Sequence, residues 1–258
     1  MNEVDQFHKQ KIENIKGLSN DSHLRELSHE WVQQAAIHNW AYNFSWFGRP
    51  AIQFPNDTWA MQELIWKIKP DLIIETGIAH GGSLIFSASM LAMLDYAEAV
   101  KNKTVLDPST SKRKVLGIDI DIREHNKSAI EQHPFAGLIQ MVEGSSVGED
   151  TIETVREIAS AYKTILVCLD SNHTHEHVLG ELNAYAPLVS KGSYCVVFDT
   201  LVEDMPLGSF PDRPWDKGDN PKTAVFEYIK ENPHFVIDSD ISDKLSITVA
   251  PEGFLRRD

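Results

Sequence analysis

Cysteine is scarce in this chain of 258 residues, which holds only Cys168 and Cys195, each inside an apolar run. Two isolated thiols cannot form the disulfide framework of a small secreted domain, so we expect both to be buried and free. The sequence also lacks an apolar stretch of the about 18–20 residues that cross a bilayer. Its polar N-terminus lacks the apolar core of a secretory signal. These absences predict a cytoplasmic protein without a transmembrane segment.

Basic residues are outnumbered, because 24 Lys and Arg stand against 38 Asp and Glu and leave a formal net charge of −14. Such a surface repels phosphate backbones, which argues against nucleic acid as a partner. The basic stretch 101–114 interrupts this pattern, and we interpret it as a solvated loop. With 42% hydrophobic and 24% charged residues, the composition is ordinary for a globular protein and excludes a disordered or fibrous chain.

Several catalytic and nucleotide-binding motifs are missing from the sequence. There is no Gly-x-Ser-x-Gly, which argues against a serine hydrolase. Neither the Gly-x-Gly-x-x-Gly of dinucleotide sites nor the phosphate-binding Gly-x-x-x-x-Gly-Lys-Ser/Thr occurs. No repeat at the spacing of solenoids or propellers is visible. The function therefore has to be sought in other patterns.

Residues 1–69 differ in pattern from the rest of the chain. Apolar residues recur at helical spacing up to about residue 40, among them Leu24, Leu27 and Trp31. The aromatic loop NFSWFGRPAIQFPND (43–57) follows, and Asp57 is expected to cap a helix that ends at Pro70. We predict an N-terminal helical extension with an aromatic loop over 1–69 and a second domain over 70–258.

Residues 70–258 alternate short apolar runs with helical segments. Seven runs are expected to be strands: DLIIE (71–75), KVLGID (114–119), GLIQMV (137–142), TILVCLD (164–170), SYCVVFD (193–199), HFVID (234–238) and LSITVA (245–250). Helices between the first five indicate a parallel sheet covered on both faces. The short polar turn DSDISDK (238–244) before the last run indicates an antiparallel hairpin at one edge. The predicted class is α/β, a Rossmann-like, doubly wound, mostly parallel seven-stranded sheet, as in methyltransferases that use S-adenosylmethionine.

A glycine-rich turn, Glu75-Thr-Gly77-Ile-Ala-His-Gly81-Gly82-Ser83, follows the first run. Gly77 and Gly81 allow a tight turn and a close approach of the backbone to a ligand. The free N–H groups at the start of the next helix, together with the Ser83 hydroxyl, suit a carboxylate or a phosphate. An ordinary turn between strand and helix is the alternative.

Two further strand ends carry candidate contacts for an adenosyl group. Asp119 ends the second run, where an acid can accept hydrogen bonds from both ribose hydroxyls. Ser145 lies after the third run in EGSS (143–146), a turn that suits an adenine edge. The alternatives are a solvated aspartate at the end of a strand and a serine that begins the next helix.

The fourth and fifth runs end in Asp170 and Asp199. Because the carboxyl ends of parallel strands open into one crevice, two carboxylates there can hold a hard divalent cation such as Mg²⁺. His173 follows Asp170 closely and is expected to act in this site. His175 and His177 are interpreted as a polar helix start.

These motifs resemble those of the cephalosporin hydroxylase family, also described as rhamnosyl O-methyltransferases. The resemblance covers about residues 46–257. Its landmarks are WFGRPAIQFPND (46–57), PDLIIETGIAHGGS (70–83), LGIDID (116–121), LDSNHTHEHVLGEL (169–182), YAPLVSKGSYCVVFDT (185–200) and RPWDKGDNPKTAV (213–225). It implies a class I, S-adenosylmethionine-dependent, Mg²⁺-assisted methyltransferase, similar in site layout to catechol and macrolide-sugar O-methyltransferases.

The resemblance also implies roles for single residues. The residues that would bind the cofactor are Glu75, Gly77, Gly81 and Ser83 at its methionine end, Asp119 at its ribose and Ser145 at its adenine. Asp170 and Asp199 match metal-binding carboxylates, and His173 matches the base of related sugar methyltransferases. Phe198 stands where some family members have an acid, so Thr200 or water is expected to complete the metal shell.

The expected function is methylation of a sugar hydroxyl in a polysaccharide, glycolipid or antibiotic. The expected partners are a small-molecule or glycan acceptor and, from the resemblance, further copies of the chain in a homo-oligomer. Two alternatives stay open. One is a hydroxylase or oxidoreductase on the same fold, and the other is a non-catalytic binding protein that has lost the metal site.

Overall fold

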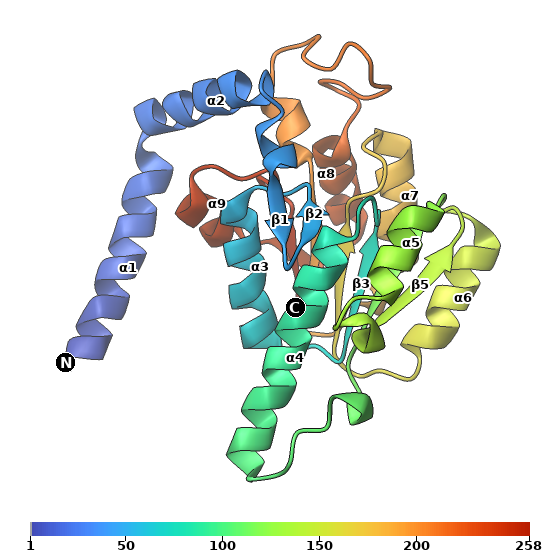
Figure 1. The fold of residues 1–258 in the computed structure, drawn as a ribbon. Helices are drawn as coiled ribbons and strands as arrows, with labels where there is room; N and C mark the ends of the chain where they lie inside the picture. The colour runs from blue at the N-terminus through green and yellow to red at the C-terminus, as the bar shows by residue number, and fades with distance from the viewer. Residues whose placement is uncertain (1) are drawn as a thin grey trace.

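The computed structural model describes residues 2–258 (Figure 1). Its main sheet has seven strands in the spatial order β5-β4-β3-β6-β7-β9-β8. Their bounds are β3 Leu72–Thr76, β4 Lys114–Asp119, β5 Ile139–Glu143, β6 Ile165–Leu169, β7 Tyr194–Val197, β8 Phe235–Ile237 and β9 Phe254–Arg257. The first five pair in parallel, whereas β9 is antiparallel to both β7 and β8. The predicted sheet is confirmed, and the order reverses between β3 and β6, where open α/β sheets bind their ligands.

The helices of residues 2–258 cover both faces of the sheet, except α1 and α2, which lie to one side of it (Figure 1). Their bounds are α1 Glu3–Asn20, α2 Ser22–Ala36, α3 Pro55–Ile68, α4 Gly82–Asn102, α5 Glu124–Glu131, α6 Glu149–Ala159, α7 His175–Tyr185, α8 Pro221–Glu231 and α9 Ser239–Leu245. Apolar side chains of α3, α4 and α5 pack on one face, and those of α6, α7 and α8 pack on the other. The layers follow from the strand sequences, since successive side chains point to opposite faces and both faces are apolar.

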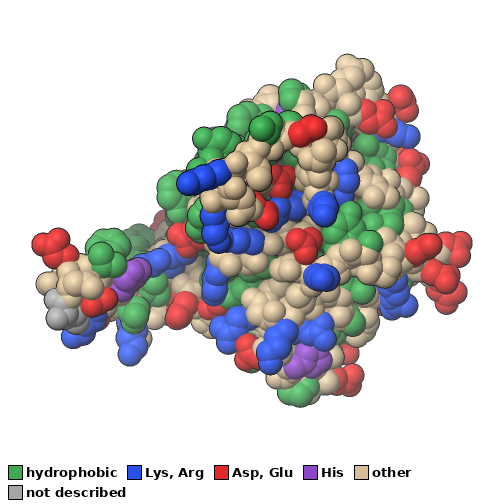
Figure 2. All heavy atoms as spheres, turned by 90° about the horizontal axis from the view of Figure 1, so that it is seen from below, with side chains coloured by type: hydrophobic (Ala, Val, Ile, Leu, Met, Phe, Trp, Pro, Cys, Tyr) green, Lys and Arg blue, Asp and Glu red, His purple; other side chains and the backbone are tan. Residues whose placement is uncertain are grey.

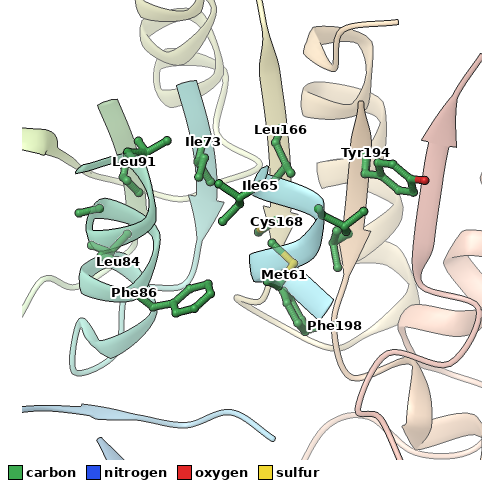
Figure 3. Close-up of a cluster of buried hydrophobic side chains, with 14 of the residues drawn as sticks. Met61, Ile65, Ile73, Leu84, Phe86, Leu91, Leu166, Cys168, Tyr194 and Phe198 are labelled. Atoms are coloured by element: carbon green, nitrogen blue, oxygen red, sulfur yellow. The ribbon is translucent and has the colours of Figure 1, made fainter. Parts of the chain in front are cut away.

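The core beneath α3 and α4 shows this alternation directly. Figure 3 shows Met61 and Ile65 of α3 directed at Ile73, Leu166 and Cys168 of the central strands. Cys168 and Cys195 are both buried and free, as predicted. Because α3 contributes to this core, the chain from residue 55 onward packs as part of the sheet layers.

The last predicted strand is wrong in position. Residues 245–250 are not a strand; β9 lies at Phe254–Arg257 instead. The predicted turn 238–244 contains α9, Ser239–Leu245. Segment 246–250 has an apolar pattern because it packs beside the sheet, where Leu201 N–H donates to the carbonyl of Val249. The predicted edge hairpin exists as a pairing of β8 with β9.

The N-terminal part contains the predicted helices, and its aromatic loop forms a short hairpin of β1 (Phe44–Trp46) and β2 (Arg49–Ala51). Trp46 donates a hydrogen bond from Nε1 to the Ser89 hydroxyl at 3.0 Å and lies edge-on to Phe86. Trp40 packs edge-on against Trp31. These aromatic rings therefore pack within the chain, and the homo-oligomer stays a prediction.

Helix α4 corrects the expectation about apolar stretches. Its 21 residues include an 18-residue window with mean hydropathy 1.3, so by length and composition it passes the test for a membrane span. Half of that window is buried inside the fold. We interpret α4 as a core helix, because Leu84, Ile85 and Leu91 are fully enclosed between it and the sheet.

Asp57 does not cap α3, because the helix begins at Pro55 after the N-cap residue Phe54. The fully buried Asp57 carboxylate instead accepts hydrogen bonds from the Thr248 hydroxyl and from the Val249 N–H. It thus ties α3 to the segment before β9. Burial raises the pKa of Asp57 to about 7, despite these hydrogen bonds.

This raised pKa predicts a pH-dependent stability. The folded protein holds the Asp57 proton more tightly than the unfolded chain, whose aspartates titrate near 3.9. Asp57 should therefore lower the free energy of unfolding as pH rises from about 4 to about 7, by up to about 1.4 kcal/mol per pH unit. Urea unfolding across this range should show the fall in wild type and a shallower one in Asp57→Asn. Asp121→Asn, at an exposed carboxylate, is the control, and an unchanged slope in Asp57→Asn would contradict the assignment.

Candidate active site

A cavity of about 600 Å³ opens at the edge where the parallel strands end. It lies between the strand ends, the C-terminal part of α2 with the residues after it, and the segment 209–215. The predicted site residues that line it are Gly77, Ser83, Asp170, His173 and Asp199. The structure thus brings the glycine turn, the two aspartates and the histidine to one cavity.

The glycine turn joins β3 to α4, and Gly81 is the N-cap residue of α4. Gly77 and Gly81 both have positive φ, +87° and +83°. A Cβ on Gly77 would lie 2.0 Å from the carbonyl oxygen of Asp170, and one on Gly81 would lie 2.5 Å from the Ile130 side chain. Gly77 is therefore required by the close approach of the β6 end, in addition to its left-handed conformation.

Glu75 is buried at the end of β3, beside the cavity. Burial raises the pKa of Glu75 to about 7, although hydrogen bonds from Ser83 and Ser87 favour the charged form. Its Oε1 atom has no hydrogen-bond partner among residues 2–258. Glu75, Ser83 and Asp170 border a small hollow of about 30 Å³ that adjoins the main cavity. A buried carboxylate oxygen without a donor fits a cationic group of a ligand.

Asp119 and Ser145 lie at the same edge of the sheet but do not line the cavity. The Asp119 carboxylate accepts hydrogen bonds from the N–H groups of Ile78 and Ala79, at 2.8 and 3.2 Å, and so holds the glycine turn. Ser145 lies in the loop after β5, where its carbonyl accepts from the Gly148 N–H at 2.9 Å. Their predicted contacts with ribose and adenine stay predictions.

Asp170, His173 and Asp199 form a close group of ionisable side chains in the cavity. One ligand atom from each lies within 4.8 Å of the other two. The His173 Nε2 atom is 3.3 Å from Asp199 Oδ2, and Gln53 donates a hydrogen bond from Nε2 to Asp170 Oδ2 at 3.0 Å. Two carboxylates and an imidazole at this spacing are a donor set that fits a divalent cation.

The electrostatics of this group also favour a cation site. Burial raises the pKa of Asp170 well above its usual range, and the carboxylates of Asp199 and Glu75 raise it further. Such a cluster of acids is costly unless it is protonated or neutralised. A bound cation removes that cost, so the raised pKa of Asp170 is consistent with a metal site.

Thr200 and Phe198 do not join this group. Thr200 is fully buried and does not line the cavity, and its hydroxyl donates a hydrogen bond to the carbonyl of Pro251 at 2.6 Å. Phe198 packs in the core beneath α3, where Figure 3 shows it beside Met61. Because Thr200 does not line the cavity, water or substrate oxygens are left to complete the shell of a metal.

Sequence reasoning missed two residues that contact the group. Gln53 binds Asp170, and Trp215 lies edge-on to the His173 ring with centroids 4.6 Å apart. Both belong to stretches that the family resemblance had marked, AIQFPND and RPWDKGDNP. That resemblance was the available signal, because neither residue lies at a strand end.

The segment that carries Trp215 is held by hydrogen bonds from several directions. Glu203 accepts from the Gly218 N–H and from the Asn220 side chain, at 2.8 and 2.5 Å. The Asp219 carboxylate accepts from the N–H of His175, which begins α7, at 2.7 Å. His175 therefore serves as a helix start, as interpreted, while His173 faces the cavity.

The strand order, the glycine turn and the cavity at the strand ends define the class of the fold, which is that of Rossmann-like methyltransferases. The chain belongs to the family described as Rhamnosyl O-methyltransferase/CmcI, whose model matches residues 38–258, and it is therefore an O-methyltransferase.

Curated relatives and solved structures agree with this assignment. The Rhamnosyl O-methyltransferase of Mycobacterium leprae is 29% identical over 228 residues, which cover 85% of this chain and 88% of the relative. Its counterpart in Mycobacterium tuberculosis (strain H37Rv) is 28% identical over 229 residues, with 85% and 83% covered. A solved CmcI structure described as containing Mg and SAM matches with a TM-score of 0.55 at 18% identity, covering 84% of this chain and 77% of that one. At that identity the structural likeness concerns the fold.

Proposed function

We propose that this protein transfers the methyl group of S-adenosylmethionine to a hydroxyl of a sugar, with Mg²⁺ bound at Asp170 and Asp199. The observation that carries the proposal is the convergence of Asp170, His173 and Asp199 in one cavity beside the glycine turn. The names of the curated relatives support a rhamnosyl unit as the acceptor.

When bound, S-adenosylmethionine supplies an activated methyl group, and Mg²⁺ lowers the pKa of a coordinated hydroxyl. Asp170 and Asp199 would hold the Mg²⁺ ion. His173 is assigned to the proton of the acceptor hydroxyl, which an imidazole nitrogen can accept. The cavity walls align acceptor and methyl group, which removes much of the entropic barrier.

Glu75 and Ser83 are assigned to the methionine end of the cofactor. The free Oε1 atom of Glu75 suits the ammonium group, while the N-terminus of α4 with Ser83 suits the carboxylate. Gly77 and Gly81 keep the turn open, Asp119 is assigned to the ribose, and Ser145 is assigned to the adenine. Thr200 is left out of the metal set because it is fully buried and does not line the cavity.

The hydroxylase alternative finds less support in the donor set. Non-haem iron oxygenases use two histidines and one carboxylate, whereas this group has one histidine and two carboxylates. The test is transfer of labelled methyl from S-adenosylmethionine to rhamnose-containing glycans, with Mg²⁺ and with a chelator. Labelled product that disappears with the chelator is expected. Binding of S-adenosylhomocysteine without transfer to any vicinal-diol sugar would favour a binding protein instead.

The pKa of Glu75 predicts a pH-dependent affinity for the cofactor. With the pKa of Glu75 at about 7, the carboxylate is only partly ionised in the free protein near neutral pH. Because the ammonium group favours the ionised form, affinity should rise as pH increases from about 6 to about 8 and then level off. Calorimetry in buffers of different ionisation enthalpy should also show a proton released on binding.

Glu75→Gln is the control for this prediction. It should bind S-adenosylmethionine more weakly at pH 8, and its affinity should change little with pH, because the group that titrates is gone. A variant with the wild-type pH dependence would assign the proton to another residue.

A further inference from the structure

The end of α4 opposite the active site projects beyond the body of the protein. In a parallel α/β unit the helix runs antiparallel to its strands, so the α4 C-terminus lies at the edge where the strands begin. Figure 1 shows this end of α4 and the loop to β4 extending below the sheet. We call residues 93–114 the α4 tip. Its position separates it from the cavity.

The α4 tip exposes several apolar side chains. Met93, Tyr96 and Val100 lie on one side of the helix, three and four residues apart, and are 53%, 55% and 60% exposed. The stripe continues into the loop, where Val105 is 93% and Leu106 is 41% exposed. No element of residues 2–258 covers these side chains, so the tip is an apolar projection into solvent.

Lysines surround this apolar stripe. The α4 tip contains five basic residues and three acids, in a chain whose net charge is −14. Arg113 is engaged by Asp95 and Glu98. Lys101, Lys103 and Lys112 are exposed, so they supply the positive charge of the tip.

The same edge of the sheet adds further cations. Exposed Lys69, Lys163 and Lys191 lie just before β3, β6 and β7, whose first residues share this edge. Figure 2 views the molecule from below and shows Lys and Arg side chains across the middle, with apolar and acidic side chains among them. Trp66, in the last turn of α3, is 52% exposed, with Lys69 beside its ring at 5.4 Å.

We propose that the α4 tip docks this protein on an anionic lipid surface. Aliphatic side chains flanked by lysines, with a tryptophan nearby, are the combination that binds the interface of a bilayer with acidic headgroups. The acidic remainder of the protein does not cancel this attraction, because charges beyond about 8 Å are largely screened at physiological salt.

The charges favour lipid over the other occupants of such a face. A second copy docked by a two-fold axis would bring the lysines of the two tips together, and like charges oppose that pairing. A nucleic acid would leave Val105 and Leu106 in water, because phosphate contacts use only the lysines. A lipid surface can contact both the lysines, through its acidic headgroups, and the apolar side chains, through its acyl chains. Docking there leaves the cavity, at the opposite edge of the sheet, facing the solution.

Flotation of the full chain with vesicles tests the proposal. Vesicles of phosphatidylcholine mixed with phosphatidylglycerol should bind the protein, whereas phosphatidylcholine alone should bind it far more weakly. Exchanging Lys101, Lys103 and Lys112 for glutamine should weaken binding about a hundredfold, and high salt should weaken it in wild type. Val105→Gln should weaken it about fivefold, because its side chain would no longer gain from leaving water.

Matched variants separate the α4 tip from total charge and hydrophobicity. Exchanging Lys9, Lys16 and Lys217 for glutamine removes the same charge elsewhere, and Ile12→Gln removes an apolar side chain that is 65% exposed. Both should bind like wild type. All exchanged side chains are exposed, so the variants should have the melting temperature of wild type.

Several results would overturn the proposal. One is equal binding to neutral and anionic vesicles. Another is a loss of vesicle binding in the control variants as large as in the α4-tip variants. Tighter binding to a DNA duplex through the same lysines would assign a polyanion instead. Self-association that Val105→Gln abolishes, without vesicle binding, would assign the face to a second copy. Methyl transfer to a water-soluble acceptor is measured separately, so the docking proposal and the proposed function can fail independently.

Discussion

Asp170→Asn should lose methyl transfer and Mg²⁺ affinity together, each by at least about a hundredfold, while S-adenosylmethionine still binds. Asp170 lies at the centre of the acidic group, within ligand distance of Asp199 and His173. An amide can replace the shape of the carboxylate but not its charge. Calorimetry with Mg²⁺ and with S-adenosylhomocysteine, beside the activity assay, measures the three quantities.

A second readout shows whether this loss is electrostatic. Because Asp199 and Glu75 raise the pKa of Asp170, the carboxylates oppose one another when no cation is bound. The variant should therefore melt at a higher temperature than wild type without Mg²⁺, and added Mg²⁺ should stabilise only wild type. Asp212→Asn, an exposed aspartate on the segment that covers the cavity, should behave like wild type. Full activity of Asp170→Asn in the presence of a chelator would remove the metal from the proposal.

His173→Ala should lower turnover by about 10²–10⁴-fold, the usual contribution of a general base. Binding of Mg²⁺ and cofactor should be retained, because the two carboxylates and the glycine turn remain. Turnover assays together with Mg²⁺ titrations measure both effects.

The geometry makes the Mg²⁺ titration decisive for His173. Its Nε2 atom is close enough to Asp199 to complete a metal site instead of serving as base. If His173→Ala loses Mg²⁺ affinity as far as Asp170→Asn does, the imidazole is a ligand and the proton goes elsewhere. His175→Ala is the matched control, because that imidazole lies 2.8 Å from the Thr223 hydroxyl and 3.2 Å from Glu227. It should keep turnover within about threefold, a surface-sized effect.

The sequence by itself determined the layers of the fold and the edge that carries the site. Apolar runs such as residues 71–75 and 164–170 read as strands buried on both faces, and helical stretches between them require parallel crossovers. Once the strands are parallel, Asp170 and Asp199 must meet at one edge. The predicted convergence of these residues therefore needed no knowledge of side-chain positions.

Only the tertiary structure decided which segment completes the sheet. Residues 245–250 have the apolar content of a strand, whereas β9 at Phe254–Arg257 contains two arginines. Burial against Asp57 and Leu201 explains the apolar content of the first segment. The local apolar pattern indicates that a residue is buried, but not whether its backbone pairs with a strand. Backbone pairing depends on contacts with distant segments, such as the one between Val249 and Asp57, about 190 residues apart in sequence.

The direction of individual side chains was likewise decided by packing. Thr200 follows Asp199 directly, yet its hydroxyl donates to Pro251, and Trp215 reaches His173 across more than forty residues. Gly77 is required by the backbone of Asp170, a contact between two different strand ends. Each of these features depends on distances between segments that only the folded chain brings together, whereas residue type and spacing already placed the carboxylates at the strand ends.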